Sequence, residues 1–278
     1  MYVQKTNSAT GNMMPYFYRK NTDNTAFCHA ANLSIKQQSK DLVNKYLKNL
    51  ASEKQQFLLE GNTILQPEAV PVSVLKTIAE NALNQMKKFP KNHILYIVTG
   101  RIGGGKSAFV EQNNFQELFY TPDADKIKPL LPGYNQHNAS YVHKVSCVIN
   151  STNISEALKR GIDTIIQTAT TIDNLDDIID EARDHNYSNI VMIHIDTNEE
   201  NAIKRAMERG ELTGRKIDPK VIKERTYIDN IVPTYKSPFK GLSQLVVYNN
   251  NGSHPIKEED INFSFLPEVL TYVTDTDK

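Results

Sequence analysis

A glycine-rich segment in the chain has the residue types and spacing of a phosphate-binding loop. Residues 100–107 read GRIGGGKS and match the pattern GxxxxGK[ST] in full. In such a loop the glycines let consecutive backbone N–H groups face phosphate oxygens, the lysine reaches the β- and γ-phosphates, and the serine hydroxyl ligates Mg²⁺. An apolar run precedes the motif and a helix-compatible stretch follows it. We therefore predict nucleotide binding, against the alternative of a flexible glycine loop whose lysine faces solvent.

The roles expected of individual loop residues follow from this motif. Lys106 would act on the transferred phosphate, and Ser107 would hold the metal ion. The residues expected to bind the nucleotide in this segment are Gly100, Arg101, Ile102, Gly103, Gly104, Gly105, Lys106, Ser107 and Ala108.

Two aspartates are candidates for the acceptor side of such a site. Transfer of a phosphoryl group to an alcohol needs a carboxylate that positions the hydroxyl and takes its proton. Asp123 and Asp125 lie in YTPDADKIK, after a predicted strand at 118–121, and an open α/β sheet delivers catalytic groups at the carboxyl ends of its strands. We predict that Asp125 is the base. For Asp123 we predict either substrate contact or capping of a helix that begins near Ala124.

Three arginines are candidates for neutralising the charge that develops on the transferred phosphate. Arg205 and Arg209 are spaced i, i+4 and share one face of a predicted helix. Arg215 follows Gly210 and Gly214, where a lid could carry it over the phosphates. The alternative is a charged helix that faces solvent.

Two further polar residues are candidates for substrate binding. Gln167 ends the predicted strand DTIIQT, on the expected active-site edge. His143 lies in NASYVHKVS on a predicted helix, where a lone histidine is more often structural than catalytic. The sequence shows neither zinc-ligand spacing nor a Ser-His-Asp or Cys-His arrangement.

The order of the predicted helices and strands around these residues indicates an α/β fold. We expect a P-loop kinase-type parallel sheet with helices on both faces. Short apolar runs alternate with segments of helical periodicity, which is typical of this class. The predicted strands are 93–100, 118–121, 163–168, 189–196 and 244–249. We divide the chain into an irregular arm (1–40), an extension of two helices (41–90), a kinase-like core (91–252) and a C-terminal tail (253–278).

Composition indicates a folded protein in which any charged ligand is bound by a local site rather than attracted by the net charge of the molecule. The 278 residues carry 32 basic and 32 acidic side chains, so no global field favours nucleic acid or an anionic membrane. Two cysteines, far apart, favour a reducing compartment. No apolar run resembles a signal peptide or a membrane span. We expect a cytoplasmic location. Delivery into another cell by a non-Sec route requires no apolar signal peptide and stays open.

Over residues 91–252 the order of motifs resembles the zeta-toxin group of P-loop kinases. The resemblance rests on TGRIGGGKS, PDADKIK with LLPGY, EALKRGIDTIIQTATT, VMIHIDTNEENAIKRAMERGELTGRKIDPKVI and LVVYNNNGS. Characterised members phosphorylate the sugar of UDP-N-acetylglucosamine with ATP and Mg²⁺. The resemblance implies that Asp125 is the base, that Arg205 and Arg215 are the lid arginines, and that the backbone near Tyr248 and Asn249 approaches the nucleotide base.

One departure from the family pattern weakens the expectation of that acceptor. The family usually carries an acidic residue, Gly, Thr and a nearby Arg after the third strand, whereas this chain reads QTATT over 167–171. Loss of the carboxylate and the guanidinium changes the hydrogen bonding and charge of the acceptor pocket.

The sequence leaves three functional hypotheses open. The first is an ATP- and Mg²⁺-dependent kinase of a small-molecule hydroxyl acceptor. The second is a nucleotide-binding toxin, effector or interaction module without transfer, in which residues 1–90 contact a protein partner. The third is a kinase of nucleosides or polynucleotide ends, against which the neutral overall charge argues. The N-terminal arm is predicted either to pack on the core or to regulate the nucleotide cleft.

Overall fold

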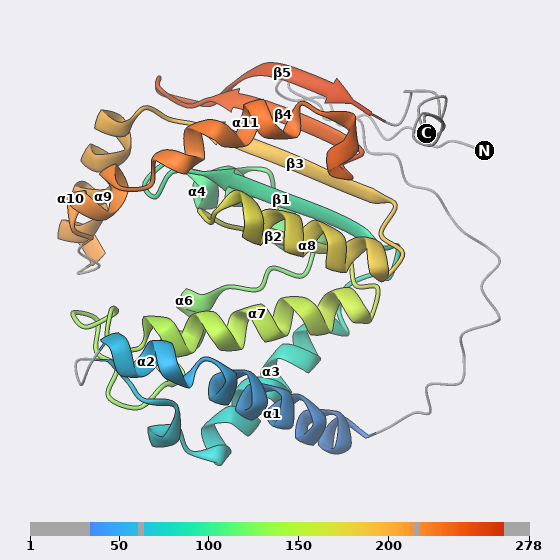
Figure 1. Ribbon diagram of the computed structural model, residues 1–278, viewed down its shortest axis with the longest axis vertical. Helices are drawn as coiled ribbons and strands as arrows, with labels where there is room; N and C mark the ends of the chain where they lie inside the picture. Colours follow the sequence, from blue (N-terminus) through green and yellow to red (C-terminus); the bar gives the residue numbers. More distant parts are fainter. Residues whose placement is uncertain (1–33, 61–63, 214–216, 264–278) are drawn as a thin grey trace, which may run out of the picture. The chain divides into compact units, whose positions relative to one another are not determined.

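Within the described residues of the computed structural model, 34–60, 64–213 and 217–263, five strands form one sheet (Figure 1). The strands are β1 (Ile94–Gly100), β2 (Thr164–Gln167), β3 (Asn189–Asp196), β4 (Gln244–Asn249) and β5 (Ile256–Asn262). Their order is β2-β1-β3-β4-β5, with the first four parallel and β5 antiparallel to β4. This arrangement confirms the predicted α/β class and adds an antiparallel edge.

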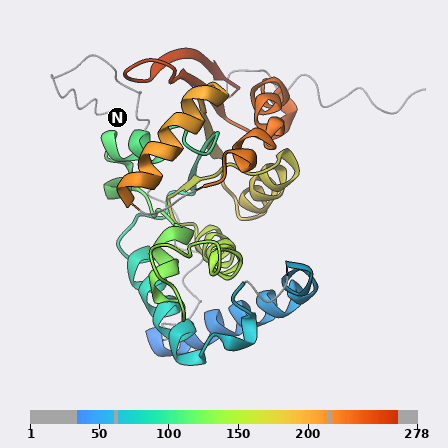
Figure 2. The same cartoon turned by 90° about the vertical axis from the view of Figure 1, so that its left-hand side faces the viewer.

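The central strands are continuous apolar runs because helices cover both of their faces. On one face of β1, Leu95 and Ile97 belong to a buried cluster with α8 (Ile172–Asp184) and α11 (Ile231–Tyr235). On the other face, the Tyr96 ring lies 5.3 Å from Phe115 of α5 (Phe115–Leu118). Figure 2 shows the sheet between α8 and α9 (Glu199–Thr213). The prediction of helices on both faces is confirmed.

The parallel register aligns the carboxyl ends of the strands at one edge of the sheet. Gly100 of β1 pairs with Ile195 of β3, and Val98 pairs with Gln167 of β2. Residues that end or follow these strands therefore meet at this edge. The connecting helices here are α4 (Lys106–Gln112), α6 (Ala124–Ile127), α7 (His143–Lys159) and α10 (Pro219–Lys223).

The N-terminal helices pack on α7 rather than on the sheet. They are α1 (Ile35–Ser52), α2 (Lys54–Glu60) and α3 (Val72–Met86). Tyr46, Leu75 and Ile149 share a second buried cluster that joins these helices to α7. Polar contacts reinforce the junction, since the Tyr46 hydroxyl donates to Asn153 Oδ1 at 2.5 Å. Both stretches predicted to be helical in the extension are helical, the first as α1 and α2 and the second as α3.

The boundary of the predicted N-terminal arm was wrong for its last residues. Helix α1 begins at Ile35, because the Ser34 hydroxyl accepts a hydrogen bond from the Gln37 N–H and caps the helix. The helix also ends at Ser52, with α2 following after Glu53 instead of one helix running toward Gly61. Residues 1–33 lie outside the described residues.

Two strand predictions also differ from the structure. Residues 118–121 form no full strand, since α5 extends through Leu118 and Tyr120 makes an isolated bridge to Thr164. Pro122, which has no N–H, follows directly. Conversely, β5 lies in the predicted tail, where its polar sequence IKEEDIN pairs with β4 at the edge of the sheet. Its residues are exposed or half-buried, and its sequence contains no continuous apolar run.

No helix in the described ranges is long and apolar enough to cross a membrane.

Candidate functional site

The phosphate loop runs from the end of β1 into α4 and is held on both sides. Gly103 and Gly105 have φ values of 80° and 94°, which favour glycine. A Cβ atom would lie 2.2 Å from the Ala202 carbonyl oxygen at Gly103, and 2.4 Å from Asn250 Nδ2 at Gly105. Asn250 Nδ2 also donates to the Gly104 carbonyl at 2.8 Å. The predicted strand-loop-helix context is present, and packing requires these glycines.

The lysine of this loop is buried and lies in the field of two arginines. Lys106 Nζ donates to the carbonyl oxygens of Gly100 and Arg101, both at 2.8 Å. Burial, together with the positive charges of Arg225 and Arg209, lowers the pKa of Lys106 to about 7. Such a gathering of positive groups is favourable when an anion neutralises it. The charge at this loop therefore favours an anionic ligand such as a polyphosphate.

Sequence reasoning missed Arg225, which follows α10. Its Nη1 donates to the Ala169 carbonyl at 2.5 Å, and the Tyr227 hydroxyl donates to the same oxygen at 2.9 Å. Ala169 lies in the loop after β2, in the QTATT segment that departs from the family pattern by lacking an arginine. The fold thus brings a guanidinium from a distant segment to this loop. Only its place in a basic stretch, KVIKER, signalled it.

The predicted lid arginines have different environments. Arg205 lies on α9 beside the phosphate loop, with Nη1 4.0 Å from the position of a Cβ at Gly105. Its Nη2 donates to the Gly252 carbonyl at 3.2 Å. Arg209, one turn further, acts electrostatically on Lys106. Arg215 lies outside the described residues, so its predicted role stays a prediction.

Asp123 caps the short helix α6 that carries Asp125. Asp123 Oδ1 accepts a hydrogen bond from the Asp125 N–H at 2.8 Å, which was one of its two predicted roles. Asp125 forms an ion pair with Lys128 Nζ at 2.8 Å. The Asp125 side chain is 38% exposed and that of Lys128 is 8% exposed, so the carboxylate of Asp125 is the solvent-accessible member of the pair. Its role as base stays a prediction, as does substrate contact by Asp123.

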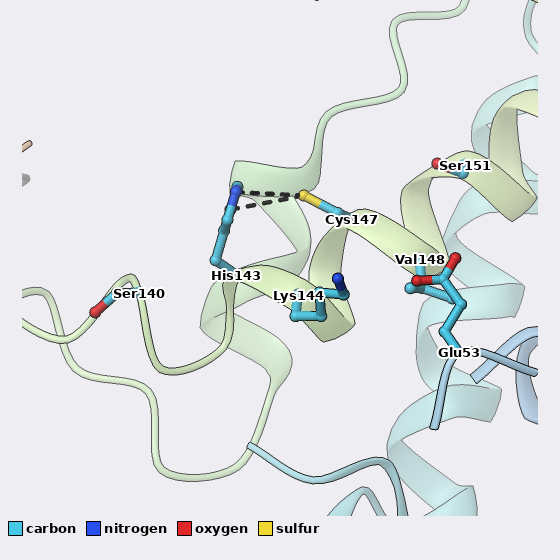
Figure 3. A pocket seen from close by; sticks show the side chains of 7 residues that line it. All are labelled: Glu53, Ser140, His143, Lys144, Cys147, Val148 and Ser151. Carbon is cyan, nitrogen blue, oxygen red and sulfur yellow. Dashed lines mark hydrogen bonds between the residues drawn. The ribbon is translucent and has the colours of Figure 1, made fainter. Parts of the chain in front are cut away.

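His143 begins α7 and faces Cys147, one turn along (Figure 3). The two ring nitrogens lie 3.6 and 3.7 Å from Cys147 Sγ. Both residues line a pocket of about 340 Å³ with Lys144 and with Glu53 of the N-terminal extension. Burial raises the pKa of Cys147, and the charge of Asp125 contributes in the same direction. The helix that carries Asp125, α6, also packs against α7.

The remaining predicted residues occupy the strand ends. Gln167 ends β2 opposite Val98 of β1, on the edge where it was predicted. The Tyr248 ring packs against Phe109, with ring centroids 4.8 Å apart. Asn249 Nδ2 donates to Glu258 Oε1 at 2.9 Å. The predicted contacts of Tyr248 and Asn249 with a nucleotide base, and of Gln167 with substrate, stay predictions.

Two more residues that the sequence reasoning did not single out lie at the end of β3. His194 is 4% exposed and shares a 2.9 Å hydrogen bond with Thr99. Burial and the charge of Lys106 lower the pKa of His194 to about 4. Asp196 ends the strand, and burial together with Glu258 and Asp229 raises its pKa. In the sequence, Asp196 could have been found because it ends a long apolar run. In P-loop proteins an aspartate at the end of such a strand commonly holds Mg²⁺.

The residues at this edge fit a magnesium ion that arrives with a nucleotide. No group of three or more His, Cys, Asp or Glu side chains among the described residues could hold a metal ion. Mg²⁺ is commonly bound by one or two protein oxygens, waters and substrate phosphates. Ser107 is exposed in the first turn of α4 and offers such an oxygen.

The parallel sheet, the glycine loop after β1 and the converging cations define a P-loop protein of the kinase type. The chain belongs to the zeta toxin family, whose model matches residues 78–256. No curated protein matches the chain.

Solved structures share this fold at low sequence identity. A chain from the PezAT chromosomal toxin-antitoxin system of Streptococcus pneumoniae is 17% identical, with a TM-score of 0.53 over 67% of this chain and 79% of that one. The AvrRxo1-ORF1:AvrRxo1-ORF2 complex with sulphate ions gives 12% identity and a TM-score of 0.52, covering 81% and 68%. The same complex has also been solved with ATP, at 11% identity and a TM-score of 0.50 over 82% and 67%.

Proposed function

We propose that the protein is an ATP- and Mg²⁺-dependent phosphotransferase that moves the γ-phosphoryl group of ATP to a hydroxyl group of a small molecule. The observation that carries this proposal is a complete phosphate loop with Arg205 beside Gly105 and with the charges of Arg225 and Arg209 acting on the buried Lys106. Binding alone needs the loop and its lysine, whereas additional guanidinium groups are what stabilise the charge of a phosphoryl group in transfer.

The proposed reaction assigns one step to each group of side chains. The loop amides and Lys106 bind the β- and γ-phosphates, and Arg205 and Arg225 neutralise charge on the γ-phosphoryl group. The oxygen of the acceptor hydroxyl forms a bond to the γ-phosphorus, and Asp125 accepts the proton of that hydroxyl. The bond between the γ-phosphorus and the β-γ bridging oxygen breaks, and ADP leaves with that oxygen. Ser107 would help to hold Mg²⁺, which would neutralise charge on the phosphate oxygens when bound.

The acceptor is proposed to enter beside α6 and the start of α7. Asp123, Asp125 and His143 come from these elements, and Gln167 ends the neighbouring strand β2. A nucleotide-sugar is one candidate for the acceptor. The QTATT loop carries no carboxylate, so the acceptor's hydroxyl groups would meet amide and hydroxyl groups there instead.

A second candidate function is nucleotide binding without transfer, as a toxin-like or effector-like interaction module. The lost acidic residue after β2 favours it, whereas Arg225 at Ala169 favours transfer. Because PezAT is a toxin-antitoxin system, a protein partner of this chain is also proposed, through residues 1–90. A nucleoside or polynucleotide-end kinase differs from the main proposal only in its acceptor. We place the protein in the cytoplasm of the cell in which it acts.

The test is an acceptor screen with radiolabelled ATP and Mg²⁺ in fractionated metabolite extracts. We expect labelled product with the wild-type protein and none with Lys106→Ala. Asp125→Asn should lower the rate by about 100-fold or more, because it removes the base. Asp177→Asn, which changes an exposed aspartate on α8, is the matched control and should be silent.

Two outcomes would contradict the proposal. If Asp125→Asn transferred the phosphoryl group at the wild-type rate, Asp125 would not be the base. Tight ATP binding with no labelled acceptor in any fraction would favour the interaction module instead.

A further inference from the structure

A second cavity, of about 290 Å³, lies between α3, α7 and the segment that contains α5 and α6. It shares no lining residue with the pocket of Figure 3 and none with the phosphate loop. Side-chain amides dominate its polar lining: Asn81, Gln85, Gln116, Asn150 and Asn153. These residues come from three separate parts of the chain, and the fold brings them to one place.

One of these amides has an unsatisfied acceptor. The Oδ1 atom of Asn150 is buried and has no hydrogen-bond partner among the described residues. The hydroxyl of Tyr46 donates instead to the neighbouring lining residue Asn153, at its Oδ1 atom, at 2.5 Å. A buried acceptor without a donor costs about 1–3 kcal/mol. A group that enters the cavity with an N–H or O–H donor would recover this energy.

The remaining lining favours a flat, uncharged group. Phe89 and Tyr120 present two rings, with centroids 6.3 Å apart and planes tilted by 55°. Burial raises the pKa of Tyr120, so its hydroxyl stays neutral. The charged lining residues, Asp123 and Lys126, have opposite signs and favour neither a net anion nor a net cation.

The volume limits the size of the occupant. Cavities of about 150 Å³ hold benzene, and pockets for drug-sized ligands begin near 300 Å³. At about 290 Å³ the cavity suits one ring with a small substituent. Side-chain amides pair with ring edges that carry a donor beside an acceptor, as Asn and Gln do with adenine.

We propose that this cavity binds a single uncharged heterocyclic ring whose edge presents an N–H donor beside a hydrogen-bond acceptor. Asn150 Oδ1 accepts from the ring, and the other amides complete the edge. Ring binding can be measured separately from the proposed phosphotransfer, because the cavity contains no phosphate-loop residue. It is connected to the site of transfer by Asp123, which lines the cavity and accepts from the Asp125 N–H.

The test measures ring binding directly by ligand-observed NMR on the full-length protein. Uracil and adenine are the probes, and neither carries a hydroxyl group that could be phosphorylated. Their nucleosides, uridine and adenosine, form a second arm that distinguishes a free base from a base with a sugar. The ligand control is 1,3-dimethyluracil, which keeps the ring and loses both N–H donors.

Protein variants locate the binding. Asn150→Leu removes the acceptor, and Asn81→Trp changes an exposed lining residue and keeps the proposal testable if Asn150→Leu does not fold. Lys106→Ala disables the phosphate loop but leaves the cavity intact. Asn174→Leu, on the exposed start of α8, is the matched control for removal of an amide.

We expect at least one base or nucleoside to bind the wild-type protein, Lys106→Ala and Asn174→Leu with equal affinity. Asn150→Leu and Asn81→Trp should each weaken that binding about tenfold or more, since a hydrogen bond or the fit of the ring is lost. Dimethyluracil should not bind. The proposal is overturned if no ring binds, which would leave a trapped water as the partner of Asn150. It is also overturned if Lys106→Ala alone abolishes binding or if dimethyluracil binds as well as uracil.

Discussion

The ammonium group of Lys106 is buried and feels the positive charges of Arg225 and Arg209, and this environment predicts proton uptake when ATP binds. In the free protein its pKa is about 7, so above this pH it is increasingly neutral. Phosphate oxygens favour the charged form and move the pKa back toward about 10.4. Between these two values, ATP binding should take up as much as one proton and weaken by up to about tenfold per pH unit as the pH rises.

Calorimetry at about pH 8.5 in buffers of different ionisation enthalpy measures this uptake. Lys106→Met is the control, because its side chain cannot be protonated. Equal uptake in the variant, or none in the wild type, would show that Lys106 is not the titrating group.

Arg225 is predicted to act on the transfer step. Its hydrogen bond to the Ala169 carbonyl directs a guanidinium to the loop beside β2, and guanidinium groups at phosphoryl-transfer sites contribute about 10³-fold or more to turnover. We expect Arg225→Gln to lower kcat by at least about 100-fold with a smaller effect on KM. Arg183→Gln, which removes an arginine bonded to the distant Gly241 carbonyl, should leave kcat unchanged. A large change in KM alone would assign Arg225 to ground-state binding.

His194 predicts how the stability of the fold depends on pH. Its pKa is about 4 in the folded protein and about 6.5 in the unfolded chain. The unfolded state therefore binds more protons between these values, and stability falls as the pH drops from about 6.5 toward 4. The expected loss from this group is about 3 kcal/mol. Urea unfolding of wild type and His194→Gln at several pH values measures it, and identical pH profiles for the two proteins would contradict it.

At the scale of elements, sequence patterns predicted what is locally encoded. The runs of β1, β3 and β4 are apolar because both faces of a parallel sheet are buried, and the phosphate loop is a contiguous motif. β5 was missed because an edge strand needs no continuous apolar run. Arg225 was missed for a different reason: its contact with Ala169 spans 56 residues and exists only after the sheet and α10 are in place.

Helix α7 is the element that links the N-terminal extension to the sheet. Val145 and Ile149 belong to the buried cluster shared with α1 and α3, whereas Ile154 and Leu158 belong to the cluster under the sheet. Its overall sequence lacks a clear apolar stripe for this reason, since different faces are buried along its length. The same helix begins with His143, so packing of the extension fixes a residue at the candidate acceptor site.

For the whole molecule, this shared helix predicts that extension and core unfold together. Deleting residues 1–90 would expose Val145 and Ile149, so the truncated protein would lose stability whether or not the extension regulates the core.

A smaller change is more informative. Leu83→Ala, at a side chain that is 1% exposed in α3, should lower the free energy of unfolding by about 2–5 kcal/mol. We expect hydrogen exchange to show the same loss of protection in α1 and α3 as in β1 and β3, whose buried residues belong to a different cluster from that of Leu83. Asn84→Ala, on the exposed side of α3, is the control. Loss of protection confined to the extension would show that it folds as a separate unit, and a regulatory role could then be tested by deletion.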